Sequence, residues 1–132
     1  MSYHGRPYWN ELNTWDTQAA MADYGRMFGW SFEQLTTADA DDNRPYYAAK
    51  VDGDFVAGVF QLVSPDFDGI PDHWFTYFAV DDLDATLAEN ESAGGWIKRQ
   101  PFMIPNFGRM CVVVGATGAA QAFIQPVAGE PE

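Results

Sequence analysis

The sequence has few basic residues, almost no cysteine and no long apolar run, and each shortage excludes a class of protein. Seven Lys and Arg stand against 19 Asp and Glu in 132 residues, which gives a formal net charge of −12. Such a negative field repels nucleic acid and anionic membrane surfaces, so neither is expected as a partner. No apolar stretch approaches the length that crosses a bilayer, and the start MSYHGRPYWNEL has no apolar secretory core.

The single cysteine, Cys111, excludes a disulfide scaffold and fits a reducing compartment, so we expect a cytoplasmic protein. It lies in the apolar run MCVVV with no basic neighbour in sequence. These surroundings predict a small buried hydrophobe and disfavour a reactive nucleophile.

What the chain does contain is an internal repeat with an offset of 66 residues. WNELNTWDTQAAMADYGRMFGW (9–30) aligns with FTYFAVDDLDATLAENESAGGW (75–96), and each segment ends in Gly-Trp. Further along, the offset becomes 64, where GVFQ (58–61) aligns with AFIQ (122–125). A duplication of this size predicts two similar modules related by a pseudo-twofold axis.

The predicted organisation is one domain, 1–132, made of modules 6–63 and 73–127. The linker between them, 64–72, is marked by two prolines and a glycine.

Each module reads as a strand, a helix and three further strands. Asp16 and Asp82 stand where helix caps are expected, and Asp52-Gly53 is a hairpin signal. TTADADDN (36–43) is expected as a long loop, and the terminal VAGEPE as a frayed tail. The predicted elements are strand 7–14, helix 17–28 and strands 30–34, 45–51 and 55–63, then strand 73–80, helix 83–93 and strands 96–100, 109–114 and 119–125.

The duplicated unit resembles the vicinal oxygen chelate superfamily, which includes glyoxalase I, the bleomycin-resistance proteins and the extradiol dioxygenases. The resemblance rests on W-x-E-L-x-T-x-D from Trp9, Y-G-x-x-F-G-W from Tyr24, and the closing G-R-M-x-V-V-x-x-x-T-G-A-x-x-A-x-x-Q-P from Gly108. It implies an α+β fold, in which two βαβββ modules form an open eight-stranded half-barrel around a cavity. It also implies a homodimer.

The resemblance further implies four metal-ligand positions, one on the first and one on the last strand of each module. They correspond to Trp9, Gly58, Phe75 and Ala122, none of which can hold a divalent ion. We therefore expect no metal and no cofactor. A displaced metal site built from His4, His73 and Glu11 is the remaining alternative, although their spacing matches no metal motif.

Strand alternation predicts which side chains line the cavity. Leu12, Thr14, Phe78 and Val80 should pack under the helices, and the opposite face should carry the site. Gly58 and Ala122 should leave space there. The expected ligand-binding residues are Trp9, Asn13, Gly58, Phe60, Phe75, Phe102, Phe107, Arg109 and Ala122, with Glu11 and Tyr77 as candidate catalytic residues.

Three functions are compatible with these residues. The first is metal-free binding of a small aromatic or apolar molecule. The acidic surface would suit such a ligand if it is a cation. The second is a lyase- or isomerase-type enzyme that uses Glu11 as a general base. The third is a structural or regulatory dimer whose cavity is filled by its own side chains.

Overall fold

The computed structural model describes residues 2–35, 45–104 and 107–127. The loop predicted at 36–43 and residues 128–132 of the predicted tail lie outside the described residues. The chain divides into two compact units. The first unit contains residues 9–35 and 45–75, and the second unit contains residues 2–8 and 76–127.

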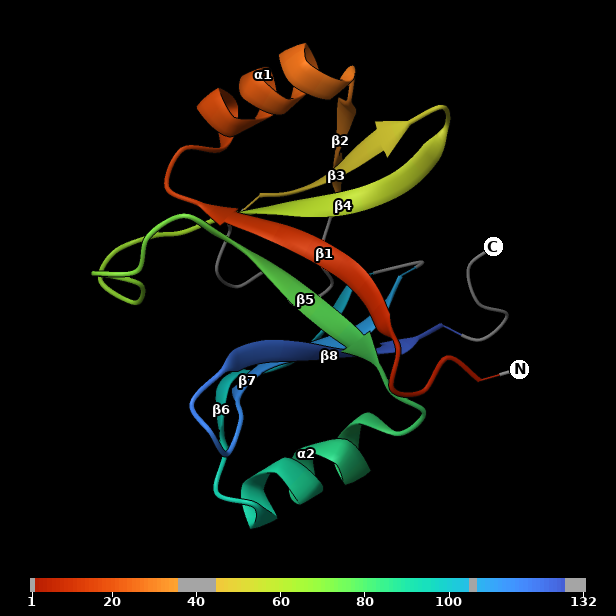
Figure 1. Ribbon diagram of the computed structural model, residues 1–132, viewed down its shortest axis with the longest axis vertical. Coiled ribbons are helices and arrows are strands. Elements are labelled where there is room, and N and C mark those ends of the chain that lie inside the picture. The colour runs from red at the N-terminus through yellow and green to blue at the C-terminus, as the bar shows by residue number, and fades with distance from the viewer. Residues whose placement is uncertain (1, 36–44, 105–106, 128–132) are drawn as a thin grey trace. The chain divides into compact units, whose positions relative to one another are not determined.

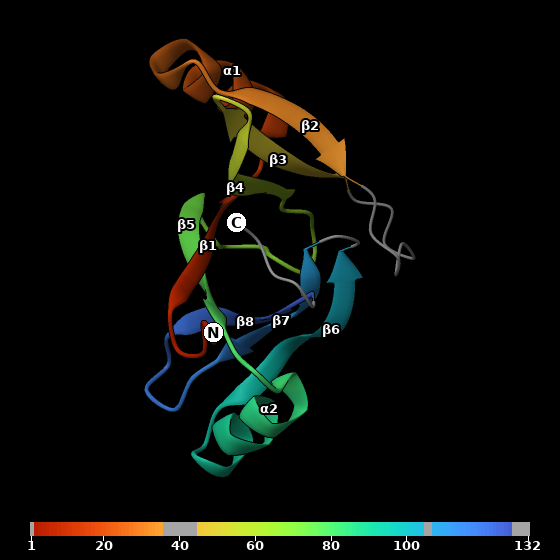
Figure 2. The ribbon, with the colours of Figure 1, turned by 90° about the vertical axis from the view of Figure 1, so that its right-hand side faces the viewer.

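The first unit carries four paired strands and one helix (Figures 1 and 2). Its strand order is β2-β3-β4-β1, in which β1 runs parallel to β4 and the other neighbours are antiparallel. The elements are β1 (Pro7–Thr14), α1 (Thr17–Phe28), β2 (Ser31–Leu35), β3 (Tyr46–Val51) and β4 (Asp54–Gln61).

The second unit repeats this arrangement with the order β5-β8-β7-β6, in which β5 is parallel to β8. The α+β class with two βαβββ modules is therefore confirmed, and every predicted element is present. The elements are β5 (His73–Ala79), α2 (Leu83–Ser92), β6 (Trp96–Ile104), β7 (Gly108–Val114) and β8 (Ala120–Pro126). The first three residues of β5, 73–75, fall in the first unit.

The two helices begin in the same way. The carboxylates of Asp16 and Asp82 accept hydrogen bonds from the backbone N–H groups of Ala19 and Ala85, each at 3.0 Å. Since the first four N–H groups of a helix have no partner inside it, these caps satisfy one donor each. Gly29 ends α1 in the left-handed region with φ 72°, as predicted.

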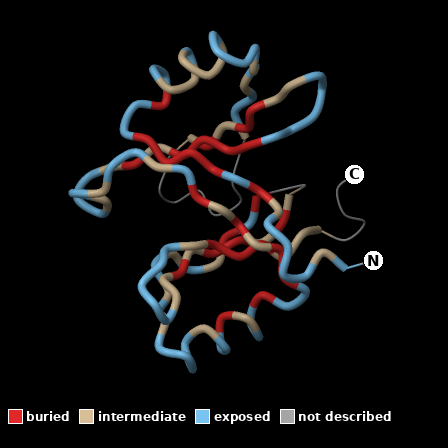
Figure 3. The backbone as a smooth tube through the Cα atoms, viewed as in Figure 1, coloured by how far each residue is buried: buried red, intermediate tan, exposed pale blue. Residues whose placement is uncertain are grey.

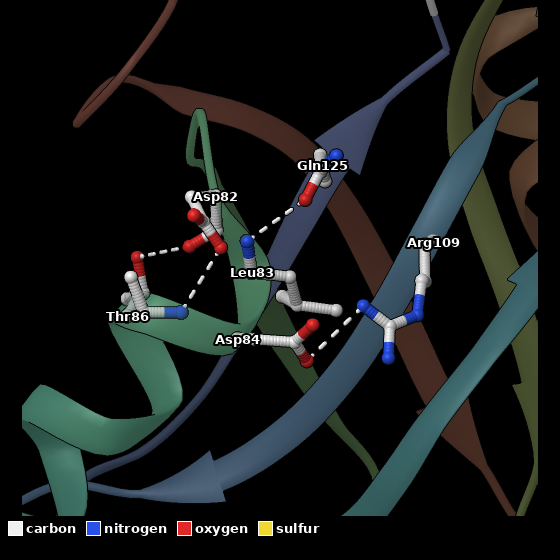
Figure 4. Close-up of polar contacts among 7 residues, drawn as sticks. Asp82, Leu83, Asp84, Thr86, Arg109 and Gln125 are labelled. Carbon is white, nitrogen blue, oxygen red and sulfur yellow. Dashed lines mark hydrogen bonds and ion pairs between the residues drawn. The ribbon is translucent and has the colours of Figure 1, made fainter.

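A glutamine at the end of the last strand of each module accepts a further backbone N–H from the start of the helix. Gln125 Oε1 of β8 accepts the N–H of Leu83 at 2.8 Å (Figure 4). In the first unit Gln61 Oε1 of β4 accepts the N–H of Thr17 at 3.4 Å. These residues are related by the offsets of 66 and 64, so the repeat extends to individual hydrogen bonds.

One strand differs from its predicted bounds in a way that affects the site. β6 continues to Ile104, so Phe102 and Met103 lie in a strand and not in the loop that was expected. Pro101 interrupts the hydrogen-bond ladder, and the pairing with β7 shifts between Arg99 and Phe102. A proline is tolerated here because β6 is an edge strand with a bulge.

The two helices differ in how much they bury. α2 buries Leu83 and Leu87, which pack with Val80, Cys111, Val113 and Phe123 in one apolar cluster. In α1 only Thr17 is buried, and the tube of Figure 3 is tan or pale blue over the rest of that helix. No helix in the described part of the chain is long and apolar enough to cross a membrane.

This difference predicts unequal costs of truncation. Leu87→Ala should lower the free energy of unfolding by about 2–4 kcal/mol, since a buried leucine leaves a cavity. Met21→Ala, at the equivalent position of α1, should cost less than about 1.5 kcal/mol because Met21 is only partly buried. Urea denaturation of both variants measures the two losses, and equal losses would contradict the difference in packing.

Candidate functional site

The polar centre of the first unit lies on β1. Glu11 and Asn13 alternate with Leu12, so both point to the face opposite the one that Leu12 shares with α1. Glu11 is 3% exposed and Asn13 is 6% exposed. In the parallel ladder Glu11 lies opposite Gly58, and Asn13 lies opposite Phe60 of β4. Two buried polar side chains thus stand on a largely apolar face.

The amide nitrogen of Asn13 is the most informative atom of this face. Nδ2 is buried and has no hydrogen-bond partner among the described residues. A buried N–H donor without a partner costs roughly 1–3 kcal/mol, and most such groups in native proteins are satisfied. An acceptor brought by another molecule would recover this energy.

The sequence predicted open space at Gly58, and this prediction is wrong. The Tyr46 side chain occupies the space. The Tyr46 hydroxyl lies over the glycine and accepts a buried hydrogen bond of 2.8 Å from Trp9 Nε1. A Cβ on residue 58 would come within 1.8 Å of Tyr46 Oη and 2.9 Å of Trp9 Nε1. The hydroxyl passes over this backbone because residue 58 has no side chain.

The remaining predicted residues of the first unit are aromatic and buried. The Phe60 ring meets Phe67 edge-on at 6.2 Å, and the Phe75 ring meets His73 edge-on at 5.9 Å. Trp9, Glu11, Asn13, Gly58 and Phe60 share one face of β1 and β4. The structure therefore brings these five predicted residues together.

In the second unit the predicted residues separate into two faces. Tyr77 pairs with Ala122, which lies opposite Val112. Phe102 lies opposite Met110 on the same face and carries the Arg99 guanidinium 3.8 Å above its ring. Phe107 lies in the turn after β6, where its N–H donates to the Ile104 carbonyl.

Arg109 lies on the other face of β7, apart from the other predicted ligand-binding residues of this unit. It alternates with Met110 and shares its face with Cys111, which packs against α2. Its guanidinium pairs with Asp84 of α2 at 3.2 Å (Figure 4). The partner is thus an exposed helix carboxylate and not a group on the Tyr77 side.

The alternative metal site is not assembled. His4 Nδ1 accepts the N–H of Asp81 at 3.0 Å, and His73 Nδ1 lies 2.8 Å from the Pro71 carbonyl. Among the residues that the structure describes, no group of three His, Cys, Asp or Glu could hold a metal ion. At the ligand positions that the resemblance implies, Trp9 Nε1 is a hydrogen donor and Gly58 is covered by Tyr46, so these residues do not fit a metal.

Cys111 is fully buried in the cluster under α2. Burial raises the pKa of its thiol from an ordinary 9.0 to about 11, with a smaller opposing effect from a backbone hydrogen bond to Phe123. A thiol that stays protonated at neutral pH is a poor nucleophile, as the sequence indicated.

An open groove of about 530 Å³ lies on the helix side of the first unit, between α1 and the ends of β1 and β5. None of the predicted site residues lines it. Its walls are Leu12, Thr14, Asp16, Ala19, Ala20, Asp23, Tyr24, Arg26, Asp72, His73 and Trp74.

The profile of the Glyoxalase/Bleomycin resistance protein/Dioxygenase superfamily matches residues 9–120. The chain belongs to this superfamily. The predicted resemblance is thereby confirmed, and superfamily membership covers both modules of the repeat.

Curated relatives support the same assignment over most of the chain. "Putative glyoxylase CFP32" of Mycobacterium tuberculosis is 36% identical over 122 residues, which are 92% of this chain and 44% of that protein. "Anthracycline biosynthesis protein DnrV" of Streptomyces peucetius is 33% identical over 129 residues, 89% of this chain and 46% of that protein. The chain thus spans less than half the length of the curated relatives that it matches.

Solved structures show the superfamily fold at low identity. A methylmalonyl-CoA epimerase of Streptomyces coelicolor is 16% identical with a TM-score of 0.67, covering 98% of this chain and 99% of that one. A hypothetical protein of Bacillus halodurans is 8% identical with a TM-score of 0.65, covering 97% and 99%. At such identities the likeness establishes the fold alone.

Tyr46 is the residue of the site that the sequence did not indicate. The Asp52-Gly53 turn alone would place Tyr47 opposite Gly58, but the register shifts between Ala49 and Lys50. After this bulge Tyr46 lies opposite Phe60 and shares its face.

Adding a methyl group at residue 58 tests the Tyr46 contact. Gly58→Ala should lower the free energy of unfolding by about 1–3 kcal/mol, since the buried Tyr46 ring must move. The double variant with Tyr46→Phe should lose less than the two single losses combined, because Oη is the atom nearest the new Cβ. Additive losses, measured by urea denaturation, would contradict the contact.

The raised pKa of Cys111 predicts an alkaline loss of stability. Between pH 9 and 11 the unfolded chain releases the thiol proton while the folded protein keeps it, so the free energy of unfolding should fall as pH rises through this window. Cys111→Ala should show a shallower fall, with the other titrating groups unchanged. Equal slopes in both proteins would show that the thiol does not contribute.

Proposed function

We propose that this protein binds a small aromatic or apolar molecule that carries a hydrogen-bond acceptor, on the β1–β4 face of the first unit. The observation that supports the proposal most is Asn13 Nδ2, which is buried and has no partner among the described residues. Trp9 and Phe60 supply aromatic surface on the same face. A largely apolar surface with a few polar groups is the usual composition of a small-molecule site.

The acceptor is the part of the ligand that Asn13 selects. A carbonyl, carboxylate or hydroxyl oxygen can take the free N–H, whereas a pure hydrocarbon leaves it unsatisfied. Discrimination by a buried hydrogen bond exceeds what an apolar contact of the same size supplies.

Glu11 adds a preference for positive charge. Its carboxyl group lies two residues before Asn13 on the same strand and is buried. A buried carboxylate is stabilised by a nearby cation, so an amine on the ligand would strengthen binding. The net charge of −12 favours the approach of such a cation.

Three probes of equal ring size separate these contributions: toluene, benzyl alcohol and benzylamine. Asn13→Ala should weaken binding of benzyl alcohol about 5-fold and leave toluene unchanged, because only the alcohol has an acceptor. Glu11→Gln should weaken benzylamine about 10-fold or more, because the charged partner is lost. Saturation-transfer NMR titrations give these affinities.

Asn10→Ala is the matched control, since Asn10 lies on the same strand but is exposed on the opposite face. It should leave all three affinities unchanged. Absence of binding by any probe, or equal losses for toluene and benzyl alcohol in Asn13→Ala, would overturn the proposal.

A second candidate function is an isomerase- or lyase-type reaction with Glu11 as the general base. The burial of Glu11 favours it, and the solved methylmalonyl-CoA epimerases that share the fold supply a reaction to test. Epimerisation requires removal of a proton from carbon and its return, which a carboxylate can perform. Methylmalonyl-CoA in deuterated water tests this. Deuterium uptake that is abolished in Glu11→Gln supports it, and no uptake by the wild-type protein rejects it.

The proposal also includes a cytoplasmic location and a homodimer. A structural or regulatory dimer without a ligand is the third reading, and it gains support if the probes and methylmalonyl-CoA all fail. Tyr46 is then an example of a side chain of this protein that occupies the predicted site, because its hydroxyl already covers Gly58.

A further inference from the structure

One side of the first unit carries a cluster of aromatic rings that are exposed or partly exposed to solvent. We call it the aromatic face, and it consists of Tyr24, Met27, Phe28, Trp30, Phe32 and Trp74. Trp30 is central, with Tyr24 stacked at 5.5 Å and Phe28, Phe32 and Trp74 within 6.4 Å between ring centroids. Phe28 is 55% exposed, Met27 52% and Trp74 42%.

The exposed area is large for a small protein. An aromatic side chain presents 150–250 Å² when free, so Phe28, Met27 and Trp74 together expose on the order of 300 Å² of largely apolar surface. Patches of roughly 300–600 Å² are the largest on typical monomers and are often functional. The surface is sufficient to form the centre of an interface.

The internal repeat shows that this apolar surface is not needed for the fold. At the 66-residue offset, Met27 and Phe28 of α1 correspond to Ala93 and Gly94 at the end of α2. The exposed side of α2 carries Asp84, Glu89 and Glu91 instead. The same element in the same module can therefore be solvated, and the first unit differs by presenting rings.

The few charged side chains near the aromatic face favour a second copy of this chain as its partner. Residues 17–32 contain one acid and one base, Asp23 and Arg26, which form an ion pair with each other. Residues 17–32 are thus electrically neutral, so two copies of a chain of charge −12 can bring this stretch together without opposing like charges. The carboxylates of Asp16 and Asp72 in the adjoining groove accept hydrogen bonds within the chain. A basic partner would find no free carboxylate among residues 17–32.

We propose that two copies of this chain pair through the aromatic face, with Trp30 near the centre. In such an isologous pair the same surface serves both partners. The groove beside the face shares Tyr24 and Trp74 as walls, and it would receive the projecting Met27 and Phe28 of the other copy. The inference rests on the homodimer proposed above and not on the ligand site, because Asn13 lies on a different element.

Phe28→Glu tests the interface by placing a carboxylate in it. Sedimentation equilibrium of the wild-type chain should give twice 14.7 kDa at tens of micromolar, and the variant should give 14.7 kDa. The dissociation constant should rise at least about 30-fold, as expected for loss of a central aromatic residue. Trp74→Ala is a second variant with the same expected outcome, and circular dichroism establishes that each is folded.

Trp96→Glu is the matched control, because Trp96 is 53% exposed and corresponds to Trp30 at the 66-residue offset. It should leave the dimer intact. A wild-type monomer at 100 μM, or folded Phe28→Glu and Trp74→Ala proteins that dimerise as the wild type does, would overturn the proposal. Benzyl alcohol binding, measured in Phe28→Glu, keeps this outcome separate from that of the ligand site.

Discussion

The hydrogen bond from each helix start to a glutamine of the last strand is the constraint on which both modules depend. It joins residues 44 apart in the first unit and 42 apart in the second. The first and last strands of a module are parallel, and a parallel pair cannot be joined by a short turn. The helix must therefore leave β1 or β5 at a fixed place, and the glutamine fixes it by taking a helix N–H that has no partner in the helix. The start of each helix is thereby held against the end of the last strand of its module.

On this common backbone the two modules have diverged in their side chains. Glu11 opposite Gly58 becomes Tyr77 opposite Ala122. An ionisable group at this position is thus confined to one module, although the backbone ladder is the same in both. The helices differ in the reverse direction, since here the first module has the more exposed side chains. Helix α2 buries two leucines in the core, whereas α1 leaves the Phe28 ring exposed. Duplication preserved the hydrogen-bonded frame and left its surfaces free to acquire separate roles.

Local signals in the sequence predicted the positions of the helices and strands well. Asp16 and Gly29 bound α1 at the predicted residues because cap preferences are short-range and strong. The bulge between Ala49 and Lys50 could not be predicted in the same way, since a one-residue slip depends on packing across the sheet. It moved Tyr46 onto the site face. The pairing of Arg109 with Asp84 could not be predicted either, because it joins β7 to a helix 25 residues away in sequence.

The tyrosine hydroxyl over Gly58 ties three positions of this face to one another. A ligating side chain at residue 58 would collide with Tyr46, and moving Tyr46 would leave the buried Trp9 N–H without its acceptor. Residues 9, 46 and 58 are therefore coupled, and a substitution at one of them changes the packing or the hydrogen bonding of the other two.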